Sequence, residues 1–190
     1  MALVRMNFES QYLRNNNEIS IILPDKPRNQ EPAEFYGSGA KYKVLWLLHG
    51  TYGDHSDWLR KSSIELYACE KDLVVVMPSA LNSNYSNWDG FAIGYSMYDF
   101  MIEELMPLIY NWFPISDKRE DNYIAGLSMG GGGTTLEKFV ATLKLARNQT
   151  EADAAKQAAI DAIRAGHNGY TVTQGLPALR ERIAQSIAGY

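Results

Sequence analysis

The stretch NYIAGLSMG, residues 122–130, decides the fold of this 190-residue chain. Its first four residues read as a short apolar strand, and the rest follows G-x-S-x-G, the pattern of a sharp turn from a strand into a helix. Such a turn exposes the serine hydroxyl at the carboxyl edge of a sheet, and glycines flank it because side chains would collide there. Ser128 is therefore the predicted nucleophile. The N–H of Met129, at a helix N-terminus, is a predicted oxyanion donor.

Upstream of this stretch, apolar runs alternate with helical segments. The runs at 43–48 (KVLWLL) and 73–77 (LVVVM) are continuous, as expected for strands buried on both faces of a parallel sheet. Helices are predicted at 57–70, with Asp57 as N-cap, and at 96–112. Alternation of this kind predicts an α/β sheet with crossover helices.

Two more strands are predicted near the start of the chain, at 2–8 and 18–23. The turn-rich residues 14–17 separate them, so we expect them to be antiparallel. Residues 24–39, rich in Pro, Gly and charge, form a predicted loop. The fold class predicted for 1–134 is therefore α/β, with a mostly parallel sheet and antiparallel N-terminal strands.

The composition changes just after the glycines at 130–133. Residues before 135 hold all four Trp and all seven Met, with 17 acidic and 11 basic residues; the rest have 5 and 7. Helices are predicted in this second part at 135–148, 151–165 and 177–187. We expect two parts of different origin, 1–134 and 135–190. The alternative is a single protein ending in surface helices, which are Ala-rich because exposed helices favour Ala.

Composition excludes several classes of function. The net charge of -4 and pI near 5.4 argue against nucleic acid or anionic membrane as a partner. No apolar run approaches the roughly 20 residues that span a bilayer, and no secretory signal is evident, so we expect a cytoplasmic protein. The single Cys69 excludes an intrachain disulfide and offers no metal cluster. We expect its thiol to be buried in a helix over 62–71.

The glycine run itself has two readings. Residues 129–135 (MGGGGTT) superficially resemble a phosphate-binding loop, but the Lys of that motif is missing. Close packing of the helix after Ser128 onto the sheet explains the glycines better. No cofactor is expected.

A second motif, HGTYG at 49–53, directly follows the predicted strand 43–48. In an α/β-hydrolase sheet the loop after the third strand supplies the second oxyanion N–H. Thr51 is the predicted donor, with Gly50 beside it as a further candidate. The alternative for His49 is a packed loop residue, but the motif gains weight from its order relative to GLSMG.

With both motifs in place, residues 1 to about 134 resemble the esterase branch of the α/β-hydrolases, close to esterase D and bacterial tributyrin esterases. That family hydrolyses short-chain acyl and other carboxylic esters through a Ser-His-Asp triad without a cofactor. The resemblance implies a small ester substrate, Ser128 as nucleophile, and a pocket near Trp88 and Tyr85, for which ordinary loop packing is the alternative. It rests on LLHGTYGDHSDWL at 47–59, LVVVMPSA at 73–80, FPISDKRE at 113–120 and NYIAGLSMGG at 122–131.

The triad is where the chain departs from this family, which places its acid and its histidine after later strands. Only 62 residues follow Ser128, and no apolar strand is predicted among them. His49 and His55 belong to the oxyanion loop, which leaves His167 as the candidate base, with no evident acid. The predicted function is a serine carboxylesterase with an incomplete triad. The alternative is a catalytically inactive chimera or truncated hydrolase fold.

Residues 156–185 resemble a different family, through an N-terminal segment of fold-type I aminotransferases. The matching motifs are G-x-x-x-Y-T and G-x-P-x-L-R, which lie between two predicted helices. The Schiff-base lysine and phosphate site of that family lie far downstream of the matched segment. The resemblance therefore implies no pyridoxal phosphate chemistry in this chain.

The missing strands also affect the edge of the sheet. The strand 122–125 is interior in the hydrolase family, whereas here nothing apolar follows to pair with it. An exposed edge invites association with another chain. We expect the helices at 135–148 and 151–165 to cover this edge, with residual self-association into a homo-oligomer.

Overall fold

The computed structural model describes residues 1–88, 90 and 96–134. The expected helices of the second part, the aminotransferase-like segment and the candidate base His167 all lie outside the described residues.

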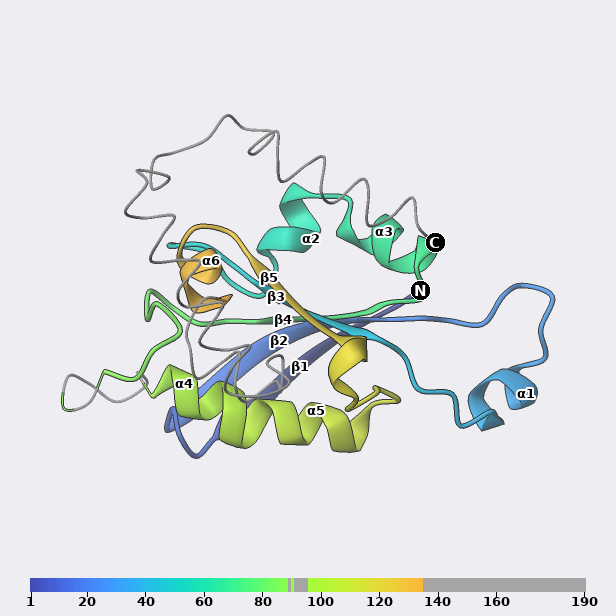
Figure 1. The fold of residues 1–190 in the computed structure, drawn as a ribbon, viewed down its shortest axis with the longest axis horizontal. Coiled ribbons are helices and arrows are strands. Elements are labelled where there is room, and N and C mark those ends of the chain that lie inside the picture. The colour runs from blue at the N-terminus through green and yellow to red at the C-terminus, as the bar shows by residue number, and fades with distance from the viewer. Residues whose placement is uncertain (89, 91–95, 135–190) are drawn as a thin grey trace. The chain divides into compact units, whose positions relative to one another are not determined.

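A five-stranded mixed sheet forms the centre of the described residues (Figure 1). The strand order is β1-β2-β4-β3-β5. β3 pairs in parallel with β4 and β5, and β2 pairs antiparallel with β1 and β4. The predicted α/β fold class is confirmed. The strands are β1 (Ala2–Ser10), β2 (Asn15–Leu23), β3 (Val44–Leu48), β4 (Val74–Pro78) and β5 (Asn122–Gly126).

Helices cover the sheet on both faces, with α2 and α3 on one side and the α4–η1–α5 segment on the other (Figure 1). The helix predicted at 96–112 is one continuous rod whose middle turn, η1, is a π-helix. The helices are α1 (Pro32–Gly37), α2 (Asp57–Lys61), α3 (Ile64–Glu70), α4 (Met97–Asp99), η1 (Phe100–Leu105), α5 (Met106–Trp112), η2 (Arg119–Asp121) and α6 (Met129–Thr134).

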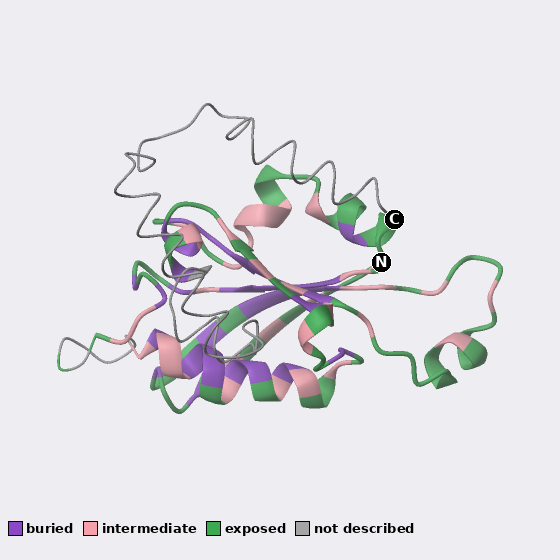
Figure 2. Ribbon diagram, in the orientation of Figure 1, coloured by how far each residue is buried: buried purple, intermediate pink, exposed green. Residues whose placement is uncertain are grey.

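The two hydrophobic cores follow the two-residue period of the strands. Trp46 and Val76 point to the α4–α5 side, where they pack with Phe100. Leu47 and Val75 alternate with them and pack on the α2–α3 side. Because β3 and β4 are buried on both faces, as Figure 2 shows, their sequences are continuous apolar runs.

Five local predictions are wrong. The predicted helix 57–70 is interrupted at Ser62, whose hydroxyl donates to the Trp58 carbonyl at 2.6 Å. The N-cap residue is Ser56, and Asp57 is the first helical residue. The Cys69 thiol is exposed, because the buried face of α3 is formed around Ala68.

The other two concern the first hairpin and the loop after it. Residues 15–17 already belong to β2, and the turn ends at Arg14, whose φ of 54° closes it. The predicted loop 24–39 contains the short helix α1, which Pro32 begins.

β5 is an edge strand of the described sheet. Its only strand partner there is β3, and the residues that face the α2–α3 side are not covered by those helices. Tyr123 is 44% exposed as a result, and β5 is coloured as mixed exposed and intermediate in Figure 2. Among the described residues, no helix combines the length and the hydropathy that a bilayer crossing requires.

Asn122 anchors the start of β5. Its amide oxygen accepts hydrogen bonds from the Tyr110 hydroxyl at 2.5 Å and from the Trp46 indole at 3.3 Å. Its amide nitrogen donates to the carbonyls of Ser116 at 3.0 Å and Lys118 at 2.8 Å. The site is buried, and this burial raises the pKa of Tyr110 to about 12, so the phenol remains a donor at neutral pH.

Asn122→Ala is expected to lower the free energy of unfolding by at least about 3 kcal/mol. Each buried group left unpaired costs about 1–3 kcal/mol, and the change leaves several. The matched control is Asn111→Ala, which removes an exposed amide bonded to the Pro107 carbonyl and should stay within about 0.5 kcal/mol. Urea denaturation of both variants measures this, and equal midpoints would contradict it.

Candidate active site

Ser128 lies on a tight turn between β5 and α6. Its φ of 54° is in the left-handed region, which non-glycine residues rarely adopt, and the residue is exposed. Three backbone hydrogen bonds hold the turn. Leu127 N–H donates to the Leu48 carbonyl at 3.2 Å, Gly130 N–H to the Leu127 carbonyl at 2.9 Å, and Gly132 N–H to the Ser128 carbonyl at 2.9 Å. Such strain persists only where surrounding contacts enforce it.

Two glycines make this turn sterically feasible. A Cβ on Gly126 would lie 2.4 Å from the Gly130 carbonyl carbon. A Cβ on Gly130 would lie 2.5 Å from the Leu48 carbonyl oxygen and 2.7 Å from that of His49. These distances are below any real Cβ contact, so both motif glycines are required by space, as the sequence pattern predicts. The backbone of α6 thus packs directly on the end of β3.

Strained backbone conformations cluster at the carboxyl edge of the parallel strands. Seven described non-glycine residues have positive φ, and five of them follow the carboxyl ends of β3, β4 and β5. Strained backbone clusters at active sites and ligand-binding loops. The five are Tyr52, Leu81, Asn84, Tyr85 and Ser128.

The predicted oxyanion loop lies against the serine. A Cβ on Gly50 would be 3.6 Å from Ser128 Cβ and 3.2 Å from the Leu127 carbonyl oxygen. Among the described residues, the N–H groups of Thr51 and Met129 have no hydrogen-bond acceptor. Two free donors beside an exposed serine are what an oxyanion hole requires. The roles of Gly50, Thr51 and Met129 remain predictions.

His49 is a structural histidine in this arrangement. Its Nε2 accepts the Ala80 N–H at 2.8 Å, so Nδ1 carries the proton and donates to the Gly50 carbonyl at 2.7 Å. Burial lowers its pKa, against a smaller opposing effect of the Gly50 carbonyl. The ring therefore stays neutral, and both nitrogens are occupied. It joins the loop after β3 to the loop after β4.

His49 should make stability depend on pH. Because its pKa is lower in the folded chain, its contribution is complete above the unfolded pKa of about 6.5 and declines as pH falls through the folded pKa. His49→Gln should therefore lose less stability than wild type between pH 7.5 and 5, by at most about 1.4 kcal/mol per pH unit. Urea denaturation across this range tests the difference, which an identical slope in both proteins would refute.

His55 takes part in a contact that the sequence analysis missed. Its Nδ1 lies 2.7 Å from the Ser20 hydroxyl, and its Nε2 lies 3.4 Å from the Glu18 carboxylate. Its own N–H donates to the Ser79 hydroxyl at 3.1 Å. The only signal in the sequence was a polar pair at 18 and 20, which shares one face of the otherwise apolar predicted strand 18–23.

The two pocket residues implied by the family resemblance have different environments. Tyr85 is fully buried, its hydroxyl donates to the His49 carbonyl at 3.3 Å, and burial raises its pKa. Trp88 is 42% exposed, and its indole donates to the Ser83 carbonyl at 2.7 Å. Their role in a pocket is untested.

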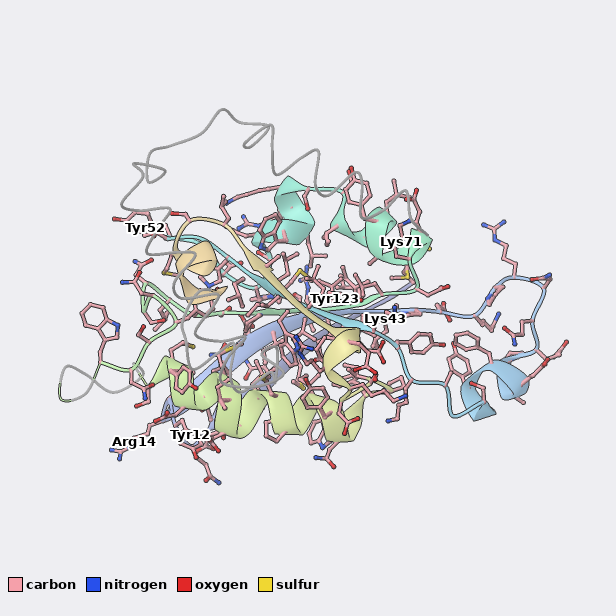
Figure 3. All side chains as sticks on the ribbon, viewed as in Figure 1. Tyr12, Arg14, Lys43, Tyr52, Lys71 and Tyr123 are labelled. Atoms are coloured by element: carbon pink, nitrogen blue, oxygen red, sulfur yellow. The ribbon has the colours of Figure 1, made fainter. Side chains whose placement is uncertain are left out.

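Other exposed apolar side chains follow strands that end at the same edge of the sheet as β5. Tyr52, Leu81 and Leu127 are 92%, 49% and 60% exposed and follow β3, β4 and β5 respectively. Figure 3 shows Tyr52 extending outward from the end of the sheet at which α6 begins. An apolar surface of this kind suits an uncharged substrate group.

The described residues include the predicted nucleophile and the predicted oxyanion donors, but no candidate base. Neither described histidine bonds to Ser128, since His49 and His55 are occupied elsewhere. Across the same residues, no group of three His, Cys, Asp or Glu side chains could hold a metal ion. This arrangement can position an acyl group and stabilise its oxyanion.

Comparisons with known proteins also indicate an esterase. An acetyl esterase of Caldicellulosiruptor saccharolyticus is 35% identical over 134 residues, which cover 70% of this chain and 49% of the relative. The solved fluorophosphonate-binding serine hydrolase F of Staphylococcus aureus has a TM-score of 0.61 at 35% identity, covering 74% of this chain and 52% of that one. The S-formylglutathione hydrolase of Staphylococcus aureus gives 0.60 at 36%, with the same coverage.

The chain spans about half the length of these relatives. Residues 10–136 match the esterase family described as "Putative esterase", which is more than half of the chain. The residues that match include both loop motifs and all of β2 to β5. This chain therefore belongs to the esterase family, with an α/β-hydrolase fold.

Proposed function

We propose that this chain carries the nucleophile and oxyanion half of a serine carboxylesterase site. The observation that carries the proposal is the strained, exposed Ser128 packed against Gly50. The Ser128 oxygen attacks the acyl carbon, the N–H groups of Met129 and Thr51 hold the oxyanion, and the alcohol leaves. Water then releases the acid from the acyl-enzyme, and the serine regains its proton.

Short acyl esters are the proposed substrates. The relatives are named for acetyl and formyl substrates, which carry two and one carbon atoms in the acyl group. The exposed Tyr52, Leu81 and Leu127 offer apolar contact for an uncharged ester. These observations support a small acyl group more than a charged or polymeric one.

A non-catalytic role is the second candidate, and one observation favours it. The described histidines are both committed to structural contacts, so no described imidazole activates Ser128. A chain of this kind would keep the sheet of a hydrolase without its turnover. Trapping of the acyl-enzyme distinguishes the two candidates.

The test is the mass of the intact chain after exposure to 4-nitrophenyl acetate. Because the exposed Cys69 thiol would also be acylated, the experiment uses a Cys69→Ala background. We expect one added acetyl group on Ser128, absent in the Ser128→Ala variant. Equal acetylation of both proteins would reject the esterase proposal and leave the non-catalytic candidate.

We also propose that the open edge of β5 pairs with a second copy of the chain. β5 has β3 on one side and no described strand on the other, and its residues Tyr123 and Ala125 are exposed. An unpaired strand edge is a template for pairing with another strand. Antiparallel pairing of two β5 strands about Ile124 would set each Tyr123 opposite an Ala125.

Tyr123→Lys is expected to reduce this self-association. Charged side chains on an edge strand oppose pairing, because two copies would bring like charges together. Sedimentation velocity over a range of concentrations measures the association, with Tyr12→Lys, a similarly exposed tyrosine outside the strands, as control. A strictly monomeric wild type would overturn the proposal.

A further inference from the structure

The loop at 49–57 needs anchoring, because its backbone provides one of the proposed oxyanion donors. Its central residues Thr51 and Tyr52 are exposed, and Tyr52 has a φ of 63°. Exposed, strained loops open easily unless other contacts hold them. The apolar Tyr52 side chain at the tip does not hold the loop in place, since it is 92% exposed.

Polar contacts hold the two ends of this loop instead. At its start, His49 bonds to the Ala80 N–H, as described above. Near its far end, His55 bonds through its backbone N–H to Ser79 and through its ring to Ser20 and Glu18 of β2. The loop is thus fixed to β2 and to the residues that follow β4.

The ring of His55 is suited to this contact. Its Nε2 faces the Glu18 carboxylate and therefore carries the proton, so Nδ1 accepts from the Ser20 hydroxyl. Ser20 is fully buried, and an unpaired hydroxyl there would be costly. The Ser20 side chain is inaccessible to any substrate, so this Ser-His-Glu arrangement is a tether and not a second nucleophilic site.

We propose that His55 is a positioning residue, which tethers the 49–57 loop to β2 and so keeps Gly50 and Thr51 against Ser128. The tether follows from the contacts of His55, and its effect on reactivity rests on the proposed function. A displacement of the loop by about 1 Å could lower reactivity by up to about 10²-fold. The described contacts of His55 are to Ser20, Ser79 and Glu18, so it acts on Ser128 only through the loop.

Amide hydrogen exchange tests the tether without any need for activity. The N–H groups of Tyr52 and His55 bond to Asn82 and Ser79 on the neighbouring loop, so their exchange reports whether the 49–57 loop stays in place. We expect His55→Leu to raise exchange at least tenfold in this loop and not in β1. Unchanged exchange would overturn the proposal.

Matched variants test whether the contact between His55 and Ser20 forms the tether. Ser20→Ala should also raise exchange, and adding it to His55→Leu should cause no further increase, because both remove one interaction. His55→Asn, which keeps an acceptor near the Nδ1 position, should restore most of the protection. Ser56→Ala is the control, since its hydroxyl bonds to Asp54 within the loop and not to β2.

Labelling of Ser128 by a fluorophosphonate, in which the serine oxygen displaces fluoride from phosphorus, tests the effect on reactivity. In His55→Leu we expect the maximal labelling rate to fall by tenfold or more with little change in the probe concentration for half-maximal rate. A labelled wild type whose rate does not change in His55→Leu would overturn the positioning role. If wild-type Ser128 is not labelled, the proposed function fails, and the exchange result alone decides whether the tether exists.

Discussion

Gly130→Ala is expected to lower the free energy of unfolding by about 3 kcal/mol or more and to abolish labelling of Ser128. The added Cβ would lie 2.5 Å from the Leu48 carbonyl oxygen and 2.7 Å from that of His49, which are both backbone atoms. Neither can rotate away as a side chain would, so α6 must shift off the end of β3. Overpacking against fixed atoms typically costs about 1–3 kcal/mol and sometimes more.

The same shift moves Ser128 relative to the predicted oxyanion loop, which is why reactivity should fall together with stability. Gly132→Ala is the matched control in the same helix, because no described atom lies within 4 Å of its Cβ position. Alanine there should raise stability by up to about 1 kcal/mol, since it favours the helix over glycine. Urea denaturation and fluorophosphonate labelling measure both variants. Equal behaviour of the two would show that the tight packing of Gly130 is unimportant.

Much of the fold was predictable because burial on two faces leaves a clear mark in the sequence. β3 and β4 lie between two layers of helices, so their runs are continuously apolar and indicated parallel strands. Helix boundaries were less predictable, because α2 and α3 are separated only by a serine pair, and the local bond from the Ser62 hydroxyl to the Trp58 carbonyl leaves no mark in the apolar periodicity. The exposure of Cys69 was also unpredictable, since it depends on which face of α3 meets the sheet.

The position of Ser128 was predictable because a motif of local geometry specifies it. G-x-S-x-G encodes a turn whose glycines must pass within contact distance of β3, and the structure has them there. The tether of His55 could not be predicted, because its partners in β2 are 35 and 37 residues away in the sequence. Histidine also gave no indication of its role, since the same residue type serves as base, ligand or structural donor.

Turnover of short acyl esters is expected to be very slow, about a million-fold below that of a complete triad enzyme. The reason is that both described histidines are already bonded to groups other than Ser128. His49 accepts the Ala80 N–H and donates to the Gly50 carbonyl, whereas His55 is held between Ser20 and Glu18. With no described imidazole to remove its proton, the proposed nucleophile Ser128 would be weak, and the proposed oxyanion donors with substrate binding would leave about 10³–10⁴-fold over water.

His167 is the remaining histidine, and its replacement decides the matter. We expect His167→Ala to leave the steady-state rate with 4-nitrophenyl acetate unchanged in the Cys69→Ala background, while Ser128→Ala removes the part above the uncatalysed reaction. An insensitive rate fits a site that has its oxyanion hole and lacks its base. Brisk hydrolysis that His167→Ala abolishes would overturn this prediction, and it would assign His167 as the general base of a complete site.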